Sequence, residues 1–148
     1  MPARILIADD HEIVREGIRT LIVRSGREWE ICGEASNGEE AVEAVRSLKP
    51  DVVILDITMP KMNGLEAARR IAALGVGCRV LMFTMHDSDR LSIEVRQAQA
   101  QGFVLKSQAA RDLIRATDRL LTGGTFFGSE PAPKSESESE LGNRPVSD

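Results

Sequence analysis

The feature that most constrains this chain is a regular alternation of two kinds of segment. Short runs rich in β-forming residues are separated by longer stretches whose apolar residues recur at helical spacing. The five β-like runs are Arg4–Ala8, Trp29–Ala35, Val52–Leu55, Arg79–Phe83 and Gly102–Leu105. This alternation is typical of a parallel sheet with helices on both faces. The sequence therefore predicts an α/β domain of five strands and five helices.

The intervening stretches differ in how clearly they predict helices. The apolar faces of four of them are Ile13, Val14, Ile18, Leu21 and Ile22; Ala41, Val42, Val45 and Leu48; Leu65, Ala68, Ile71, Ala72 and Leu74; and Leu113, Ile114, Ala116, Leu120 and Leu121. The fourth stretch, Ser88 to Ala100, is only weakly amphipathic, so its limits are poorly defined. Asn37, three residues before Glu40, predicts an N-cap for the second helix.

Composition excludes several classes of protein. The chain has 148 residues, a net charge of −4 and a pI near 5.3, which argues against sequence-independent binding to nucleic acid. Two isolated cysteines, Cys32 and Cys78, indicate neither a zinc site nor a disulfide framework. Apolar runs fall far short of the ~20 residues of a membrane span. We expect a cytoplasmic protein with no membrane association.

The composition changes after Phe127. Residues 128–148 are rich in Ser, Glu and Pro and contain a Ser-Glu alternation, which cannot bury enough apolar surface to fold alone. We expect a folded domain over residues 1–124 and a linker or disordered tail over 125–148. Nothing in the tail has the pattern of a recognition helix, so we expect no DNA-binding domain within the chain.

Polar residues with chemical potential follow several predicted strands. The first strand ends at Asp9-Asp10, the third at Asp56, the fourth at Thr84 and the fifth at Lys106. Because the carboxyl ends of parallel strands meet at one edge of the sheet, these side chains are expected to gather there. Each has an ordinary structural role open to it, such as a turn, a cap or a surface lysine. The set of five together is much harder to explain in that way.

The predicted cluster has a consistent chemistry. Neighbouring carboxylates raise one another's pKa values, and a divalent cation removes that conflict. Oxygen ligands of this kind suit Mg²⁺. A carboxylate can also attack phosphorus and become an acyl phosphate, while a lysine and a cation neutralise charge on the transferred group.

The same residues lie in motifs that resemble the receiver domains of two-component response regulators. The stretches are Ile5-Leu-Ile-Ala-Asp-Asp-His11, Asp51-Val-Val-Ile-Leu-Asp-Ile-Thr-Met-Pro60, Met62-Asn-Gly-Leu-Glu66, Val80-Leu-Met-Phe-Thr84 and Gly102-Phe-Val-Leu-Lys106. The resemblance covers roughly residues 3–122. It implies a flavodoxin-like, doubly wound (βα)5 fold with a five-stranded sheet.

The resemblance also implies a role for each matching residue. Asp56 corresponds to the phosphoacceptor, with Lys106 and Thr84 contacting the phosphoryl group. Mg²⁺ would be bound by Asp10, Asp56 and the backbone carbonyl of Thr58, with Asp9 acting largely through water. The pair Thr84 and Phe103 corresponds to the conformational switch, and Thr58 and His86 occupy positions that tune the lifetime of the phosphoryl group.

Two departures from the family pattern bear on the output surface. Phe103 stands where a Tyr is common, so the switch residue has no hydroxyl to donate or accept a hydrogen bond. Gln99 stands where Gly is common, and if that position needs a positive φ, Gln costs about 1 kcal/mol. The helix expected between Ser88 and Ala100 is then extended, shifted in register or mobile.

Three segments further resemble the NarL/FixJ (LuxR-type) branch of this family. They are Asp9-Asp-His11, Met85-His-Asp87 and Gly123-Gly-Thr-Phe-Phe127. The resemblance implies a sensor histidine kinase as partner, a possible homodimer on phosphorylation, and DNA binding only through a helix-turn-helix domain absent from this chain. We expect the regulatory part of a transcription regulator that catalyses only its own Mg²⁺-dependent phosphorylation and dephosphorylation. A natural stand-alone receiver, acting by protein contact or as a phosphate sink, is the alternative. A Mg²⁺-dependent phosphatase is disfavoured because Thr58, rather than an acid, follows two residues after Asp56.

Overall fold

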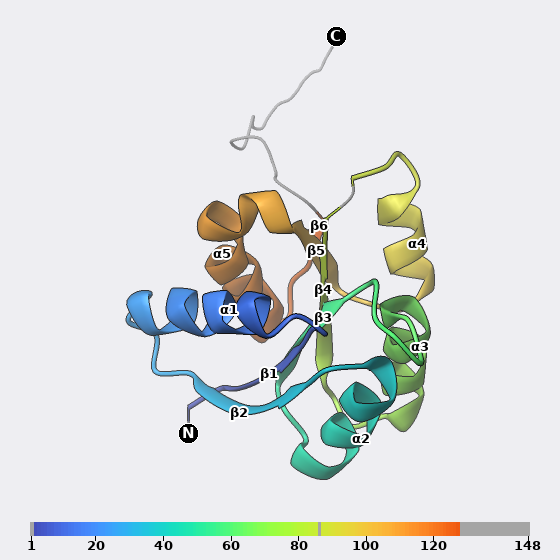
Figure 1. Ribbon diagram of the computed structural model, residues 1–148, viewed down its shortest axis with the longest axis horizontal. Helices are drawn as coiled ribbons and strands as arrows, with labels where there is room; N and C mark the ends of the chain where they lie inside the picture. Colours follow the sequence, from blue (N-terminus) through green and yellow to red (C-terminus); the bar gives the residue numbers. More distant parts are fainter. Residues whose placement is uncertain (1, 86, 128–148) are drawn as a thin grey trace, which may run out of the picture.

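A computed structural model describes residues 2–85 and 87–127, which form one parallel sheet flanked by helices (Figure 1). The strands are β1 (Arg4–Ala8), β2 (Glu30–Ala35), β3 (Val52–Asp56), β4 (Arg79–Thr84), β5 (Gly102–Leu105) and β6 (Phe126–Phe127). The helices are α1 (Glu12–Arg24), α2 (Gly38–Leu48), α3 (Gly64–Leu74), α4 (Leu91–Gln97) and α5 (Ala109–Leu121), and a 3₁₀ turn covers Lys106–Gln108. Every strand pair is parallel, and the order across the sheet is β2-β1-β3-β4-β5-β6.

The predicted α/β class and the alternation of strands with five helices are confirmed. The expected number of five strands is wrong by one within the described residues, because Phe126 and Phe127 add a sixth strand beside β5. The linker predicted from residue 125 therefore begins with a segment of the sheet. The rest of that predicted linker, 128–148, lies outside the described residues.

Two helical layers cover the sheet. In Figure 1, α1 and α5 lie on one side of the sheet, and α2, α3 and α4 lie on the other. Each layer closes its own apolar cluster, one around Ile5, Ile54 and Leu113 and the other around Leu6, Val53 and Val95. Successive residues of a strand point to opposite faces, so the central strands must be apolar throughout. β3 is buried along its whole length, as its continuous apolar run predicts.

Asparagine side chains cap the N-terminal ends of α2 and α3. The side-chain oxygen of Asn37 accepts the backbone N–H of Glu40 at 2.9 Å, which confirms the predicted N-cap of α2. Asn63 caps α3 in the same way, accepting the N–H of Glu66 at 2.9 Å. Each cap satisfies a backbone donor that the helix itself leaves without a partner.

Helix α4 is the shortest of the five helices in the described chain. It covers Leu91–Gln97, well inside the expected stretch from Ser88 to Ala100. It ends just before Gln99, whose φ is +66°, in the left-handed region that favours Gly. The suspected need for a positive φ at this position is confirmed. No helix in the described part of the chain is long and apolar enough to cross a membrane.

Candidate functional site

Strand phase explains why three charged side chains meet at the carboxyl edge of the sheet. Residues alternate between the two faces, so Asp9, Asp56 and Lys106 continue the phase that places Ile7, Ile54 and Val104 on the α1–α5 face. They extend from β1, β3 and β5, which belong to one sheet. The sequence pattern therefore requires the three side chains to converge.

The contacts in the structure confirm the convergence. The Nζ of Lys106 lies 2.9 Å from Oδ2 of Asp9 and 3.5 Å from Oδ1 of Asp56. Both carboxylates are buried, at 1% and 3% exposure. The backbone N–H of Thr58 donates to Oδ1 of Asp56 at 3.2 Å. One lysine therefore balances two buried carboxylates, which leaves the site with an excess of negative charge.

That excess appears in the pKa of Asp56, which is raised to about 6. Burial is the main cause, because it disfavours the charged form, and the nearby charge of Asp9 adds to it. The Lys106 ammonium and the Thr58 N–H act in the opposite direction. Asp56 still ionises near neutral pH, but its carboxylate is held in an unfavourable environment that a further cation would relieve.

A candidate metal site lies at the same place. Ligand atoms of Asp9, Asp10, His11 and Asp56 all lie within 4.8 Å of one another. Oδ2 of Asp9 is buried and makes no hydrogen bond, since the Lys106 ammonium approaches it without hydrogen-bonding geometry. Buried carboxylate oxygens that share a single lysine as counter-charge fit a hard divalent cation such as Mg²⁺.

The loop after β3 is held by a close backbone contact. The N–H of Gly64 donates to the carbonyl of Ile57 at 2.7 Å. A Cβ added at Gly64 would lie 2.1 Å from the carbonyl oxygen of Asp56, so only Gly allows this approach. The start of α3 is therefore locked against the strand that carries Asp56, and the loop between them places exposed Thr58 at the mouth of the site.

The remaining predicted residues lie on β4, the neighbour of β3, and on β5, the next strand across the sheet. Thr84 ends β4 and Phe103 lies in β5, and both are buried at 6% exposure. Phe103 pairs in register with Met82, which lies two residues before Thr84. Paired residues and residues two apart share a face, so Thr84 and Phe103 both lie on the α4 face of the sheet. His86 lies outside the described residues.

Comparison with known proteins identifies the family. The sequence profile of the response regulator receiver domain matches residues 5–118. The chain belongs to the response regulator receiver domain family. A receiver domain is not a conventional enzyme, so the phosphatase alternative is set aside.

The receiver domain is similar to regulators of the NarL/FixJ branch. It is 38% identical to Response regulator UvrY of Escherichia coli over 86% of the chain and 58% of that protein. It is 34% identical to the nitrate/nitrite response regulator protein NarL of the same species, over 89% of the chain and 61% of that protein. The chain thus spans about three fifths of the length of these relatives.

Solved structures agree with this assignment. A LuxR family two-component response regulator from Aurantimonas sp. superposes with a TM-score of 0.80 at 37% identity, covering 86% of this chain and 90% of that one. The isolated receiver domain of RcsB from Salmonella enterica, solved with phosphomimetic BeF₃⁻, superposes at 0.78 with 28% identity, covering 88% and 95%. The predicted family and branch are confirmed.

Two features of the receiver domain were not anticipated from sequence. The Nδ1 of His11 lies 3.3 Å from Oδ1 of Asp9 and 3.2 Å from Oδ1 of Asp10, so His11 belongs to the acidic cluster. Its place directly after the two aspartates was a usable signal. Arg15 donates to the backbone carbonyl of Asp9 at 2.6 Å and to Glu34 at 2.8 Å, which ties α1 to the site.

Proposed function

We propose that this receiver domain accepts a phosphoryl group on Asp56 from a sensor histidine kinase. The observation that carries the proposal is the buried carboxylate of Asp56 at the carboxyl edge of β3, with the Lys106 ammonium 3.5 Å away and the carboxylates of Asp9 and Asp10 beside it. A nucleophile, a cation and candidate metal ligands are the parts that phosphoryl transfer requires.

The attack needs an ionised carboxylate with a free oxygen. The pKa of about 6 leaves Asp56 ionised at neutral pH. Thr58 and Lys106 both contact Oδ1, so we assign Oδ2 to the attack. A P–O bond to Oδ2 forms as the P–N bond to the kinase histidine breaks, and the imidazole leaves in its neutral form because its other ring nitrogen already carries a proton in the phosphohistidine. Lys106 stabilises the charge on the phosphoryl oxygens.

Asp10, Asp56 and the carbonyl of Thr58 would bind Mg²⁺ directly, with Asp9 acting through water. When bound, the cation supplies positive charge that offsets the repulsion among the carboxylates and the charge of the transferred group. The donor set supports this choice, because three carboxylates and a carbonyl offer the hard oxygen ligands that Mg²⁺ prefers. His11 lies within the cluster and adds a nitrogen atom at its rim.

The phosphoryl group would switch the domain through Thr84 and Phe103. Thr84 moves toward the new acceptor oxygens, and Phe103 turns into the space that Thr84 leaves. The shared face of the two side chains supports this coupling. Thr58 and His86, two residues after Asp56 and Thr84, would tune the rate of hydrolysis of the acyl phosphate.

The domain would serve as the regulatory part of a transcription regulator that dimerises on phosphorylation and binds DNA through a helix-turn-helix domain. The relatives favour this role, since one of them, at 36% identity, is the transcriptional regulatory protein DegU of Brevibacillus brevis. A stand-alone receiver is the second candidate. A helix-turn-helix encoded in frame after codon 148 would exclude it.

Intact mass after incubation with acetyl phosphate and Mg²⁺ tests the central step. We expect one added phosphoryl group on the wild-type chain and none on Asp56→Asn. Glu43→Gln, a matched removal of one carboxylate at an exposed site, should still take up the group. An adduct that survives Asp56→Asn, or no adduct on the wild type, would refute the proposal.

A further inference from the structure

The short strand β6 has one residue in each apolar cluster. Phe126 is fully buried and packs with Leu113, Ala116 and Leu120 on the α5 face. Phe127 is half-buried and packs with the cluster on the opposite, α4 face. A strand of two residues is too short to be stable alone, so it depends on these two side chains and on its pairing with β5.

The pairing with β5 requires a residue without a side chain. Gly102 and Phe103 pair in register with Phe126 and Phe127, and the N–H of Phe126 donates to the carbonyl of Gln101 at 3.1 Å. A Cβ added at Gly102 would lie 2.1 Å from the carbonyl oxygen of Phe126. Gly102 thus permits β6 to lie against the edge of the sheet.

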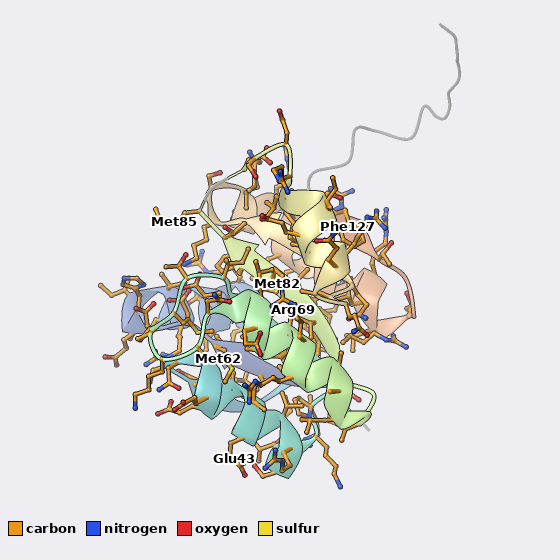
Figure 2. The ribbon with its side chains drawn as sticks, turned by 90° about the vertical axis from the view of Figure 1, so that its right-hand side faces the viewer. Glu43, Met62, Arg69, Met82, Met85 and Phe127 are labelled. Atoms are coloured by element: carbon orange, nitrogen blue, oxygen red, sulfur yellow. The ribbon has the colours of Figure 1, made fainter. Side chains whose placement is uncertain are left out.

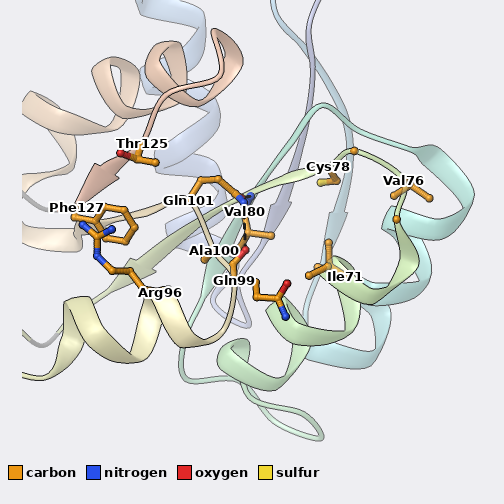
Figure 3. A pocket seen from close by; sticks show the side chains of 13 residues that line it. Ile71, Val76, Cys78, Val80, Arg96, Gln99, Ala100, Gln101, Thr125 and Phe127 are labelled. Carbon is orange, nitrogen blue, oxygen red and sulfur yellow. Dashed lines mark hydrogen bonds between the residues drawn. The ribbon is translucent and has the colours of Figure 1, made fainter.

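Phe127 joins Phe103, which turns in the proposed switch, to helix α4. Its ring lies 6.3 Å from the ring of Phe103, at an interplanar angle of 70°, which is a favourable edge-on contact. The guanidinium of Arg96, from α4, lies 3.7 Å from the centroid of the Phe127 ring, close enough for a cation–π contact. Figure 3 shows Arg96 extending from α4 to this ring, and Figure 2 places Phe127 beside α4.

Strand register puts the phosphoryl-sensing residue and β6 on the same face. Thr84 shares the α4 face with Phe103, and Phe103 shares it with its register partner Phe127. The three side chains therefore cross three adjacent strands on one side of the sheet. Phe126 lies on the other side, against α5, and has no such connection to Thr84.

We propose that β6 passes the phosphorylation state of the receiver domain to the polypeptide that follows it, with Phe126 as the fixed anchor and Phe127 as the responsive contact. The inference rests on the proposed function, since it requires phosphorylation of Asp56. When Phe103 turns toward the space left by Thr84, its ring moves away from Phe127. Phe127 then loses its contact with the Phe103 ring and keeps the one with Arg96, so β6 is held less firmly on the α4 face.

Hydrogen exchange of the Phe126 N–H tests the inference, because that proton is bonded only while β6 is docked on Gln101. The full chain is measured by NMR before and after phosphorylation with acetyl phosphate and Mg²⁺, with intact mass recorded on the same sample. Loss of one aromatic pair should speed exchange about two- to tenfold. The Glu30 N–H, bonded to Ala3 at 2.7 Å at the far side of the sheet, is the reference and should not change.

Two matched variants separate the responsive contact from the anchor. Phe127→Leu keeps an apolar side chain but removes the ring, so exchange at Phe126 should no longer respond to phosphorylation, while the rate of adduct formation is unchanged. Phe126→Leu makes the same change on the α5 face and should keep the response.

The outcomes distinguish the inference from the proposed function. A phosphorylated sample whose Phe126 N–H exchanges at the unphosphorylated rate refutes the inference alone. A Phe127→Leu variant that responds as the wild type does also refutes it. A chain that takes up no phosphoryl group refutes the proposed function and the inference together.

Discussion

Strand β5 is held by different forces at its two ends. At its carboxyl end, Lys106 faces two buried carboxylates that it cannot fully neutralise. At its amino end, Gly102 and Phe103 pair with β6 through backbone hydrogen bonds and aromatic contacts. The carboxyl end therefore has more negative than positive charge. At the amino end, the backbone groups are hydrogen-bonded and the aromatic rings are packed.

This difference indicates how one short strand can contribute both to phosphoryl transfer at Asp56 and to the proposed transmission of the signal through β6. The charged end changes when a phosphoryl group or a cation arrives, because either one alters the balance of charge. The charges beside the packed end are guanidinium groups such as that of Arg96, which stay protonated, so this end changes only if Phe103 moves. The two ends can therefore be disrupted separately, and the predictions below do so in order of expected effect.

The largest effect is expected at the charged end, from Lys106→Met. Removing the ammonium leaves Asp9 and Asp56 without their shared counter-charge and takes a cation from the transferred group. Adduct formation with acetyl phosphate should slow by about 10²–10³-fold, as for loss of one preorganised electrostatic contact. The rate is measured by intact mass against time. Lys49→Met, at an exposed position after α2, should react like the wild type, and equal rates for both variants would contradict the role of Lys106.

Two glycine substitutions disrupt the phosphorylation site and the β5–β6 pairing separately. The added methyl group of Gly64→Ala meets the backbone of Asp56, and that of Gly102→Ala meets the backbone of Phe126. Each should lower the free energy of unfolding by about 3 kcal/mol, toward the upper end for overpacking. Only Gly64→Ala should also slow phosphorylation.

Denaturant unfolding and adduct rates measure both effects. Gly17→Ala, in α1 with open space around it, is the control and should raise stability by about 0.5–1 kcal/mol. Slower phosphorylation in Gly102→Ala would show that the two regions are not separable.

A smaller effect follows from the charge on Asp56 in the metal-free protein. Its raised pKa means that the folded chain binds a proton more tightly than the unfolded chain, so stability falls as pH rises from about 4 to about 6. At pH 7.5 with a chelator, Asp56→Asn should be more stable than the wild type by about 1–2 kcal/mol. The difference should disappear near pH 4, where both side chains are neutral.

Chemical denaturation across this pH range provides the measurement. Glu43→Gln, which removes an exposed carboxylate paired with Arg46, should change stability by only a few tenths of a kcal/mol. A stability gain in Asp56→Asn that is the same at pH 4 and pH 7.5 would exclude the buried charge as its cause.

The smallest effect concerns the strained residue after α4. Gln99→Gly should raise the free energy of unfolding by about 0.5–1 kcal/mol, because Gly adopts a φ of +66° without steric cost. Gln97→Gly, two residues earlier at the end of α4, should lower it by a similar amount. Thermal unfolding compares the two, and a loss of stability in Gln99→Gly would mean that its side chain contributes more than its backbone costs.

The sequence was sufficient to predict the charged end of β5. Apolar strands end abruptly at Asp9, Asp56 and Lys106, and parallel strands bring those ends to one edge. Spacing alone could not reveal that burial raises the pKa of Asp56, since burial is a property of the packed domain. The contribution of His11 was visible in its position but not in its contacts.

The pairing of β6 with the amino end of β5 could not be predicted from the sequence. A strand of two residues has no periodicity, so Phe126 and Phe127 looked like the start of a linker. Their place in the sheet depends on Gly102 lying open at the edge of β5, which is a tertiary feature. The short α4 was not predicted, because Gln99 led us to expect a helix that is extended, shifted in register or mobile, whereas α4 ends at Gln97.

The most direct test of the account is to identify the phosphorylated residue chemically. After phosphorylation with acetyl phosphate and Mg²⁺, borohydride reduces an aspartyl acyl phosphate to homoserine, with release of phosphate. Peptide mass spectrometry of the reduced chain should find homoserine at position 56 and unchanged aspartate at Asp9 and Asp10. Homoserine at either of those two positions, with Asp56 intact, would contradict the central claim.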